Sequence, residues 1–130
     1  MQSQKPKILL VDDEQLVREL LARLLAYSGF AVEEAENGAA ALQMARQLDG
    51  SLSLVVTDIN MPVMNGLDFA RALRSTDPRI PFLFITAVDP ALIHEPGLRA
   101  EILVKPFTPD VFLETVSRMI APVSGPGQLA

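Results

Sequence analysis

The sequence contains no cysteine, so disulfide bonds and thiolate metal sites are excluded and the redox compartment stays open. It also lacks any apolar run long enough to span a membrane. The N-terminal stretch MQSQKPK has no apolar core of the kind found in secretion signals. We therefore expect a cytoplasmic protein with no membrane association.

Basic residues are scarce as well. Eleven Lys and Arg stand against sixteen Asp and Glu, which gives a formal net charge of −5. No Lys/Arg cluster exceeds what one helix face normally carries, so direct nucleic-acid binding is not expected. Hydrophobic residues, in contrast, make up 49% of the 130 residues. A chain of this length and composition is expected to fold as one domain with a buried core.

Short apolar runs alternate with segments of helical periodicity. Strands are expected at Ile8–Val11, Phe30–Ala35, Leu54–Val56, Ile80–Thr86 and Glu101–Val104. Helices are expected at Val17–Leu25, Ala39–Leu48, Leu67–Arg74 and Asp110–Ile120. This alternation, with short connections, predicts an α/β fold in which helices cover both faces of a doubly wound parallel sheet.

The domain boundaries follow from the same pattern. Residues 1–6 are expected to be disordered, and residues 7–120 to form the domain. Residues 121–130, APVSGPGQLA, are expected to be a flexible C-terminal tail or linker, because a Pro/Gly/Ser-rich segment of this kind cannot pack.

The segment Val88–Arg99 is less regular than the rest of the domain. Pro90, Pro96 and Gly97 leave room for barely one helical turn, because proline inside a helix costs about 3 kcal/mol. A shortened or irregular helix is therefore expected here. His94, the only histidine, lies within this segment and is interpreted as an ordinary loop residue.

Polar side chains stand where the apolar strands stop. Asp12 and Asp13 follow the first strand, Asp58 the third and Lys105 the fifth, while Thr86 ends the fourth. The carboxyl ends of parallel strands meet at one edge of a sheet, where such folds bind ligands. Two carboxylates ~4 Å apart repel by about 4 kcal/mol at an effective dielectric of 20. Lys105 can neutralise one charge, and the remaining charge of about −2 favours a hard divalent cation such as Mg²⁺ or Mn²⁺.

A hard cation beside a carboxylate, a lysine and a hydroxyl is suited to phosphoryl transfer. The cation and Lys105 would stabilise charge on the transferring oxygens, and Thr86 would donate a hydrogen bond to one of them. Asp58 would be the nucleophile and would form an acyl phosphate. No general base is needed, because a carboxylate is already ionised at neutral pH.

Four motifs carry a specific resemblance: KILLVDDE, TDINMPVMNG, ITA and VKPF. Over residues 7–120 the chain resembles the CheY-like receiver domain of two-component response regulators. The resemblance implies a flavodoxin-like five-stranded sheet with strand order 2-1-3-4-5. It also implies a phosphorylation-dependent switch that takes phosphate from a sensor histidine kinase or a histidine phosphotransfer protein and is read by a protein partner of unspecified identity.

The resemblance also assigns roles to single residues. Asp12, Asp13 and Asp58 would hold Mg²⁺ together with the backbone carbonyl of Asn60. Asp58 would accept the phosphoryl group, and Thr86 and Lys105 would bind it. The peptide bond between Lys105 and Pro106 would be cis.

Two positions depart from the family pattern or bear on the lifetime of the phosphate. The family usually carries Tyr or Phe three residues before the strand-five lysine, as a switch coupled to Thr86; this sequence has Ile102. We therefore expect the phosphorylation chemistry to be retained and the relay from it to differ. Val88 offers no polar group to position water, which predicts slow autodephosphorylation.

Other functions remain open at this point. The chain could be a receiver-like binding module that works without phosphate, or the receiver piece of a hybrid kinase or larger regulator. A phosphatase of the haloacid-dehalogenase type also uses an aspartate nucleophile and Mg²⁺. That class carries a second Asp two residues after the nucleophile, where this sequence has Asn60. The oligomeric state is not determined by the sequence.

Overall fold

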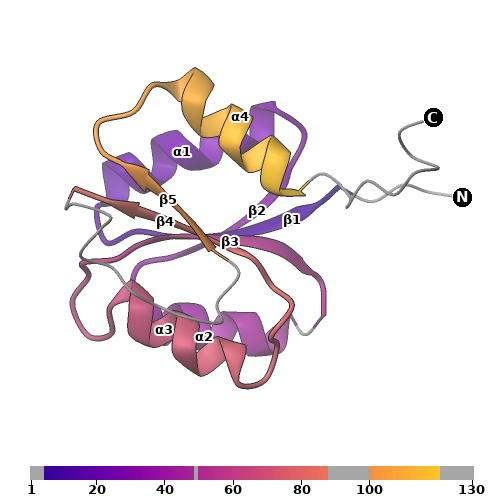
Figure 1. The fold of residues 1–130 in the computed structure, drawn as a ribbon, viewed down its shortest axis with the longest axis vertical. Coiled ribbons are helices and arrows are strands. Elements are labelled where there is room, and N and C mark those ends of the chain that lie inside the picture. The colour runs from indigo at the N-terminus through magenta and orange to yellow at the C-terminus, as the bar shows by residue number, and fades with distance from the viewer. Residues whose placement is uncertain (1–4, 49, 88–99, 121–130) are drawn as a thin grey trace, which may run out of the picture.

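In a computed structural model, described for residues 5–48, 50–87 and 100–120, five parallel strands form one sheet with helices on both faces (Figure 1). The strands are β1 (Lys7–Val11), β2 (Ala31–Ala35), β3 (Leu52–Asp58), β4 (Phe82–Thr86) and β5 (Ala100–Val104). The helices are α1 (Gln15–Tyr27), α2 (Gly38–Gln47), α3 (Gly66–Arg74) and α4 (Pro109–Ile120). The strand order is β2-β1-β3-β4-β5, which confirms the predicted doubly wound topology.

Three expectations fall partly or wholly outside the described residues. They are the disorder of residues 1–6, the irregular helix within Val88–Arg99 and the flexible tail at 121–130. The label α4 accordingly belongs to the C-terminal helix, Pro109–Ile120. Within the described ranges, no helix is long and apolar enough to cross a membrane.

The sheet separates two hydrophobic cores. Successive strand residues point to opposite faces, so each central strand supplies both cores. Helices α2 and α3 cover one face, and α1 and α4 cover the other (Figure 1). The buried residues of β1, β3 and β4 on the α2/α3 side are Leu9, Val11, Val55, Phe82 and Phe84. Those on the α1/α4 side are Ile8, Leu10, Leu54, Val56, Leu83 and Ile85. Because β1, β3 and β4 are buried on both faces, the ends of these strands are rigid supports for the residues that follow them.

Side-chain caps fix where the helices begin. The Asn65 side chain accepts a hydrogen bond of 2.8 Å from the backbone N–H of Asp68 and so starts α3. The Thr108 hydroxyl accepts one of 3.1 Å from the N–H of Val111 at the start of α4, where Pro109 is the first helical residue. Such caps satisfy N–H groups that have no partner inside the helix. The Asn65 cap matters for function, because it limits the loop after Asp58 to a few residues.

Candidate functional site

The carboxyl ends of β1, β3, β4 and β5 bring the predicted polar residues to one edge of the sheet. One oxygen from each of Asp12, Asp13 and Asp58 can be chosen so that all three lie within 4.8 Å of one another. The Lys105 Nζ lies 3.1 Å from the Asp58 Oδ2. Asp12 and Asp58 are buried, with 1% and 8% of their surfaces exposed, and Asp13 is exposed. Four residues from separate parts of the chain thus form one cluster, and Asp58 and Lys105 alone are 47 positions apart in the sequence. Solvent reaches the cluster through the exposed Asp13.

Backbone and side-chain donors orient the two buried carboxylates. The N–H of Glu14 donates to the Asp12 Oδ1 at 2.8 Å. The N–H of Asn60 donates to the Asp58 Oδ1 at 3.2 Å, while Lys105 takes the other oxygen. Each Asp58 oxygen therefore accepts one hydrogen bond. The three carboxylates together form a set of metal ligands that consists of oxygen atoms alone. Such a set fits a hard divalent cation of the Mg²⁺ or Mn²⁺ kind.

Burial and like charge act together on Asp12. Removal from water raises the pKa of Asp12 above its usual value, although the hydrogen bond from Glu14 works against this. The negative charges of Asp58 and Asp13 raise it further. Burial alone would lower the pKa of Lys105, but the hydrogen bond to Asp58 and the nearby carboxylates outweigh it and raise the pKa. At neutral pH the site therefore holds a fixed cation beside an excess of negative charge, which strains the metal-free state.

Replacing Asp12 with Asn should stabilise the metal-free protein. Carboxylates 4.8 Å apart repel by about 3.5 kcal/mol at an effective dielectric of 20. Part of the gain is lost with the attraction to Lys105, so we expect about 1–2 kcal/mol more unfolding free energy for Asp12→Asn at pH 7 in EDTA. Urea denaturation measures this difference.

The sign of the pH dependence follows from the raised pKa of Asp12. Ionised Asp12 costs stability, so the advantage of Asp12→Asn should shrink as the pH falls through the folded-state pKa and the native carboxyl is protonated. Saturating Mg²⁺ should reverse the order of stability, because only the native protein keeps all three carboxylates. An Asp12→Asn variant that is less stable than the native protein in EDTA at pH 7 would contradict this account.

The remaining predicted residues belong to β4, β5 and the connection that follows β5. Thr86 is buried at the end of β4, and its carbonyl accepts a hydrogen bond of 2.8 Å from the N–H of Lys105. The Lys105–Pro106 peptide bond is cis. Ile102 is paired with Phe84 across β4 and β5 and packs, half buried, against the core on the α2/α3 side.

Two residues of this region were not singled out from the sequence. Arg18, on α1, donates from Nη1 to the backbone carbonyl of Asp12 at 2.7 Å. Gly66, at the start of α3, lies against the backbone of Asp58, and its N–H donates to the Ile59 carbonyl at 2.9 Å. A basic residue one turn into the helix after the paired acids was the only available signal for Arg18. The NG pair marked a turn at Gly66 but gave no hint of the close backbone contact.

Known proteins have sequences similar to this chain. Residues 8–117 match the family described as the response regulator receiver domain. Response regulator MprA of Mycobacterium sp. (strain KMS) is 37% identical over 126 residues, which are 92% of this chain and 54% of that protein. The chain spans about half the length of the curated relatives it matches.

Solved structures share the fold. The chemotaxis response regulator CheY4 of Vibrio cholerae has a TM-score of 0.80 at 34% identity, covering 89% of this chain and 99% of that one. The response regulator protein TrrA from Thermotoga maritima, in complex with Mg(2+)-BeF, has a TM-score of 0.76 at 32% identity, covering 88% and 98%. The range that matches the family, residues 8–117, spans the three acids and Lys105.

Proposed function

The chain belongs to the response regulator receiver domain family, and from this premise we propose that it is a phosphorylation-dependent signalling switch. In this proposal Asp58 accepts a phosphoryl group from the phosphohistidine of a sensor histidine kinase or a histidine phosphotransfer protein. The observation that carries it is the Asp58 carboxylate, bound to Lys105 at 3.1 Å and close to two further acids. That combination supplies a nucleophile, a fixed cation and ligands for a divalent metal at one point.

The chain's own residues divide the work of transfer. An oxygen of Asp58 attacks the phosphorus, a new O–P bond forms, and the P–N bond of phosphohistidine breaks with its electron pair going to the imidazole. Lys105 stays protonated, because its pKa is raised, and offsets the charge on the phosphoryl oxygens. The Thr86 hydroxyl would donate to one of these oxygens.

Asp12, Asp13, Asp58 and the backbone carbonyl of Asn60 would hold Mg²⁺ or Mn²⁺. The metal, when bound, neutralises charge on the phosphoryl group and on the carboxylates around it. The Mg(2+)-BeF complex of Thermotoga maritima TrrA, a related structure, supports this choice of cation.

The surface beside the site suits a protein phosphodonor. An apolar groove of about 370 Å³ runs between α1 and the connection from β5 to α4. Lys105 and Glu14 line it next to Leu20 and Phe107, and Leu20 is exposed. A helix of the donor that covered this groove would bury apolar surface within reach of Asp58. We infer that the phosphohistidine approaches over α1.

Readout and lifetime depend on residues beyond the acid cluster. Thr86 would respond to the phosphoryl group, and Ile102, which replaces the usual aromatic residue, would repack without a hydroxyl or a ring. The loss of phosphate to water would be slow, on the reasoning from Val88, a residue outside the described ranges. The receiver of a longer regulator and a free-standing one are both compatible with this proposal.

Metal-dependent phosphorylation tests the proposed function directly. The purified chain is incubated with acetyl phosphate and Mg²⁺, and its intact mass is measured. We expect the mass of one added phosphate, mapped by peptide analysis to Asp58 and lost when EDTA replaces Mg²⁺. A chain that acquires no phosphate from acetyl phosphate or from a phosphohistidine donor, or that acquires it at another residue, would overturn the proposal.

A further inference from the structure

Arg18 connects the acid cluster to the edge of the sheet. Its Nη1 donates to the Asp12 carbonyl at 2.7 Å, and its Nε donates to the Glu34 Oε1 at 3.2 Å. The Arg18 side chain is only 14% exposed, whereas that of Glu34, on the edge strand β2, is 40% exposed. One planar guanidinium thus bridges a backbone oxygen within the cluster and a carboxylate on another strand.

The Asp12 carbonyl belongs to the peptide unit that joins the two neighbouring acids. A peptide unit is planar, so a hydrogen bond to this oxygen fixes the orientation of the whole unit between the Cα atoms of Asp12 and Asp13. The N–H of Asp12 is held as well, because it donates to the Ala35 carbonyl at 3.2 Å. Arg18 therefore acts on the directions in which both carboxylates leave the backbone.

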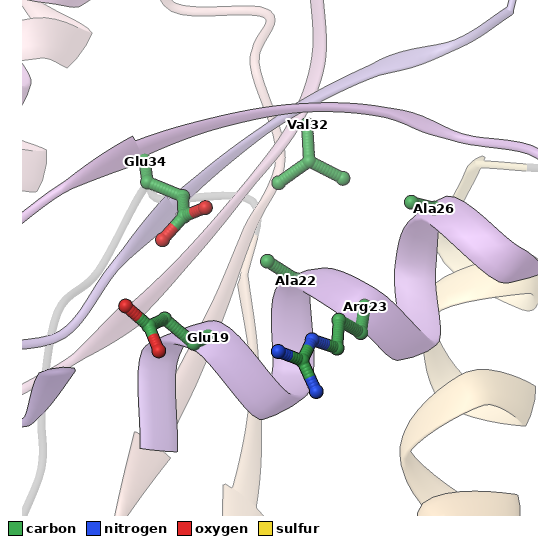
Figure 2. Close-up of a pocket in the computed structure, with 6 residues that line it drawn as sticks. All are labelled: Glu19, Ala22, Arg23, Ala26, Val32 and Glu34. Atoms are coloured by element: carbon green, nitrogen blue, oxygen red, sulfur yellow. The ribbon is translucent and has the colours of Figure 1, made fainter. Parts of the chain in front are cut away.

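Stability alone does not account for this placement. A partly exposed ion pair such as Arg18–Glu34 typically contributes little to folding free energy. Glu34 lines a cavity of about 330 Å³ between α1 and β2, where Figure 2 shows its carboxylate and that of Glu19 directed into the space. Arg23, from the next turn of α1, lines the same cavity. Glu34 thus remains within reach of solvent while it anchors a guanidinium that has lost most of its own hydration.

We propose that Arg18 is a positioning residue for the acid cluster that would bind a divalent cation, and that Glu34 holds the Arg18 guanidinium in place. This inference rests on the proposed function only in that the three acids bind a divalent cation. Arg18 contacts no metal ligand atom; it orients the peptide unit from which two of the acids project. Its contribution belongs to the outer shell of contacts that commonly sets metal affinity.

The test is Mg²⁺ binding by isothermal titration calorimetry, without any phosphodonor. Arg18→Met should weaken Mg²⁺ binding by about 10- to 100-fold, the range typical of outer-shell changes at metal sites. Arg18→Lys keeps a donor for one of the two acceptors and should recover part of that loss. Glu34→Gln removes the anchoring charge and should weaken binding by less than Arg18→Met does.

Arg23→Met is the matched control, because it makes the same change on the same helix. Arg23 is exposed and has no hydrogen bond or ion pair to another described residue. The Mg²⁺ affinity of the Arg23→Met variant should therefore equal that of the native chain. Urea denaturation in EDTA supplies the readout that separates positioning from folding. Arg18→Lys and Glu34→Gln should lose affinity while their metal-free stability stays close to native.

The outcomes separate the two proposals. A native chain that binds no Mg²⁺ would overturn the metal assignment and this inference with it. A native chain that binds Mg²⁺, together with Arg18→Met of equal affinity, would overturn this inference alone. In a third outcome, the Arg18 and Glu34 variants lose Mg²⁺ affinity only in proportion to the stability that they lose without metal. Arg18 would then have a purely structural role, and this inference would again be overturned.

Discussion

Asp58→Asn should acquire no phosphate from acetyl phosphate in the presence of Mg²⁺. The amide oxygen of Asn carries no formal charge and is a poor nucleophile, so the O–P bond should not form at this position. The substitution is nearly isosteric, and Asp12 and Asp13 remain, so the fold should be retained. Intact-mass measurement after incubation should show the unmodified chain, where the native protein gains one phosphate.

The control for this result is Asp68→Asn, the same substitution at an exposed carboxylate on α3. Asp68 pairs with Arg71 at 2.7 Å, at the helix surface and outside the acid cluster. Its replacement should leave both the rate and the extent of phosphorylation unchanged. If Asp58→Asn gained as much phosphate as the native chain, Asp58 would not be the acceptor.

The same experiment separates the nucleophile from its supporting charges. Lys105 forms no bond to phosphorus in the proposed reaction, so its loss should slow transfer without abolishing the adduct. Among the three clustered carboxylates, Asp58 is the one that forms an ion pair with Lys105, at 3.1 Å. The position of that lysine, rather than acidity alone, distinguishes the proposed acceptor from Asp12 and Asp13, the other two acids of the cluster.

The parts of the site that follow from strand ends were predictable. Buried parallel strands consist of continuous apolar runs, so the polar residues that follow each run mark the edge of the sheet. Asp12, Asp58, Thr86 and Lys105 all stand at such positions, and the structure brings them to the same edge. The topology was predictable for a related reason, because alternating strands and helices restrict a chain to few arrangements.

Contacts made by loops and helix faces were not predictable in the same way. The Arg18–Glu34 pair depends on how α1 is rotated over the edge strand, and the two residues are 16 positions apart. Hydrophobic periodicity fixes which face of α1 is buried, but it does not say which polar residue at the border reaches a particular carbonyl. The same holds for Asn60, whose role as a metal ligand through its carbonyl stays a prediction.

Gly66 is the position where the loop after Asp58 tolerates least change. A Cβ at position 66 would overlap the Asp58 carbonyl oxygen and lie 3.1 Å from the Asp58 carbonyl carbon. These are backbone atoms at the end of a buried strand, so no side-chain rotation can relieve the contact. We expect Gly66→Ala to lower the unfolding free energy by about 3 kcal/mol, at the upper end of overpacking effects. Urea denaturation of the metal-free protein measures the loss.

The sign of the stability change separates the clash at Gly66 from the effect of helix propensity. Gly66 is the first residue of α3, where alanine in place of glycine would otherwise favour the helix by up to about 1 kcal/mol. Gly50→Ala is the control: Gly50 has a φ of 75° and no atom near its added Cβ, so it costs only conformational strain. Gly66→Ala should therefore lose clearly more stability than Gly50→Ala, and equal losses would show that the Asp58 backbone yields.

The same contact should also affect phosphorylation, because it displaces the carbonyl of Asp58 itself. Gly66→Ala should slow phosphorylation in the fraction of the protein that remains folded. The tight start of α3 would then be tied to the geometry of the proposed acceptor.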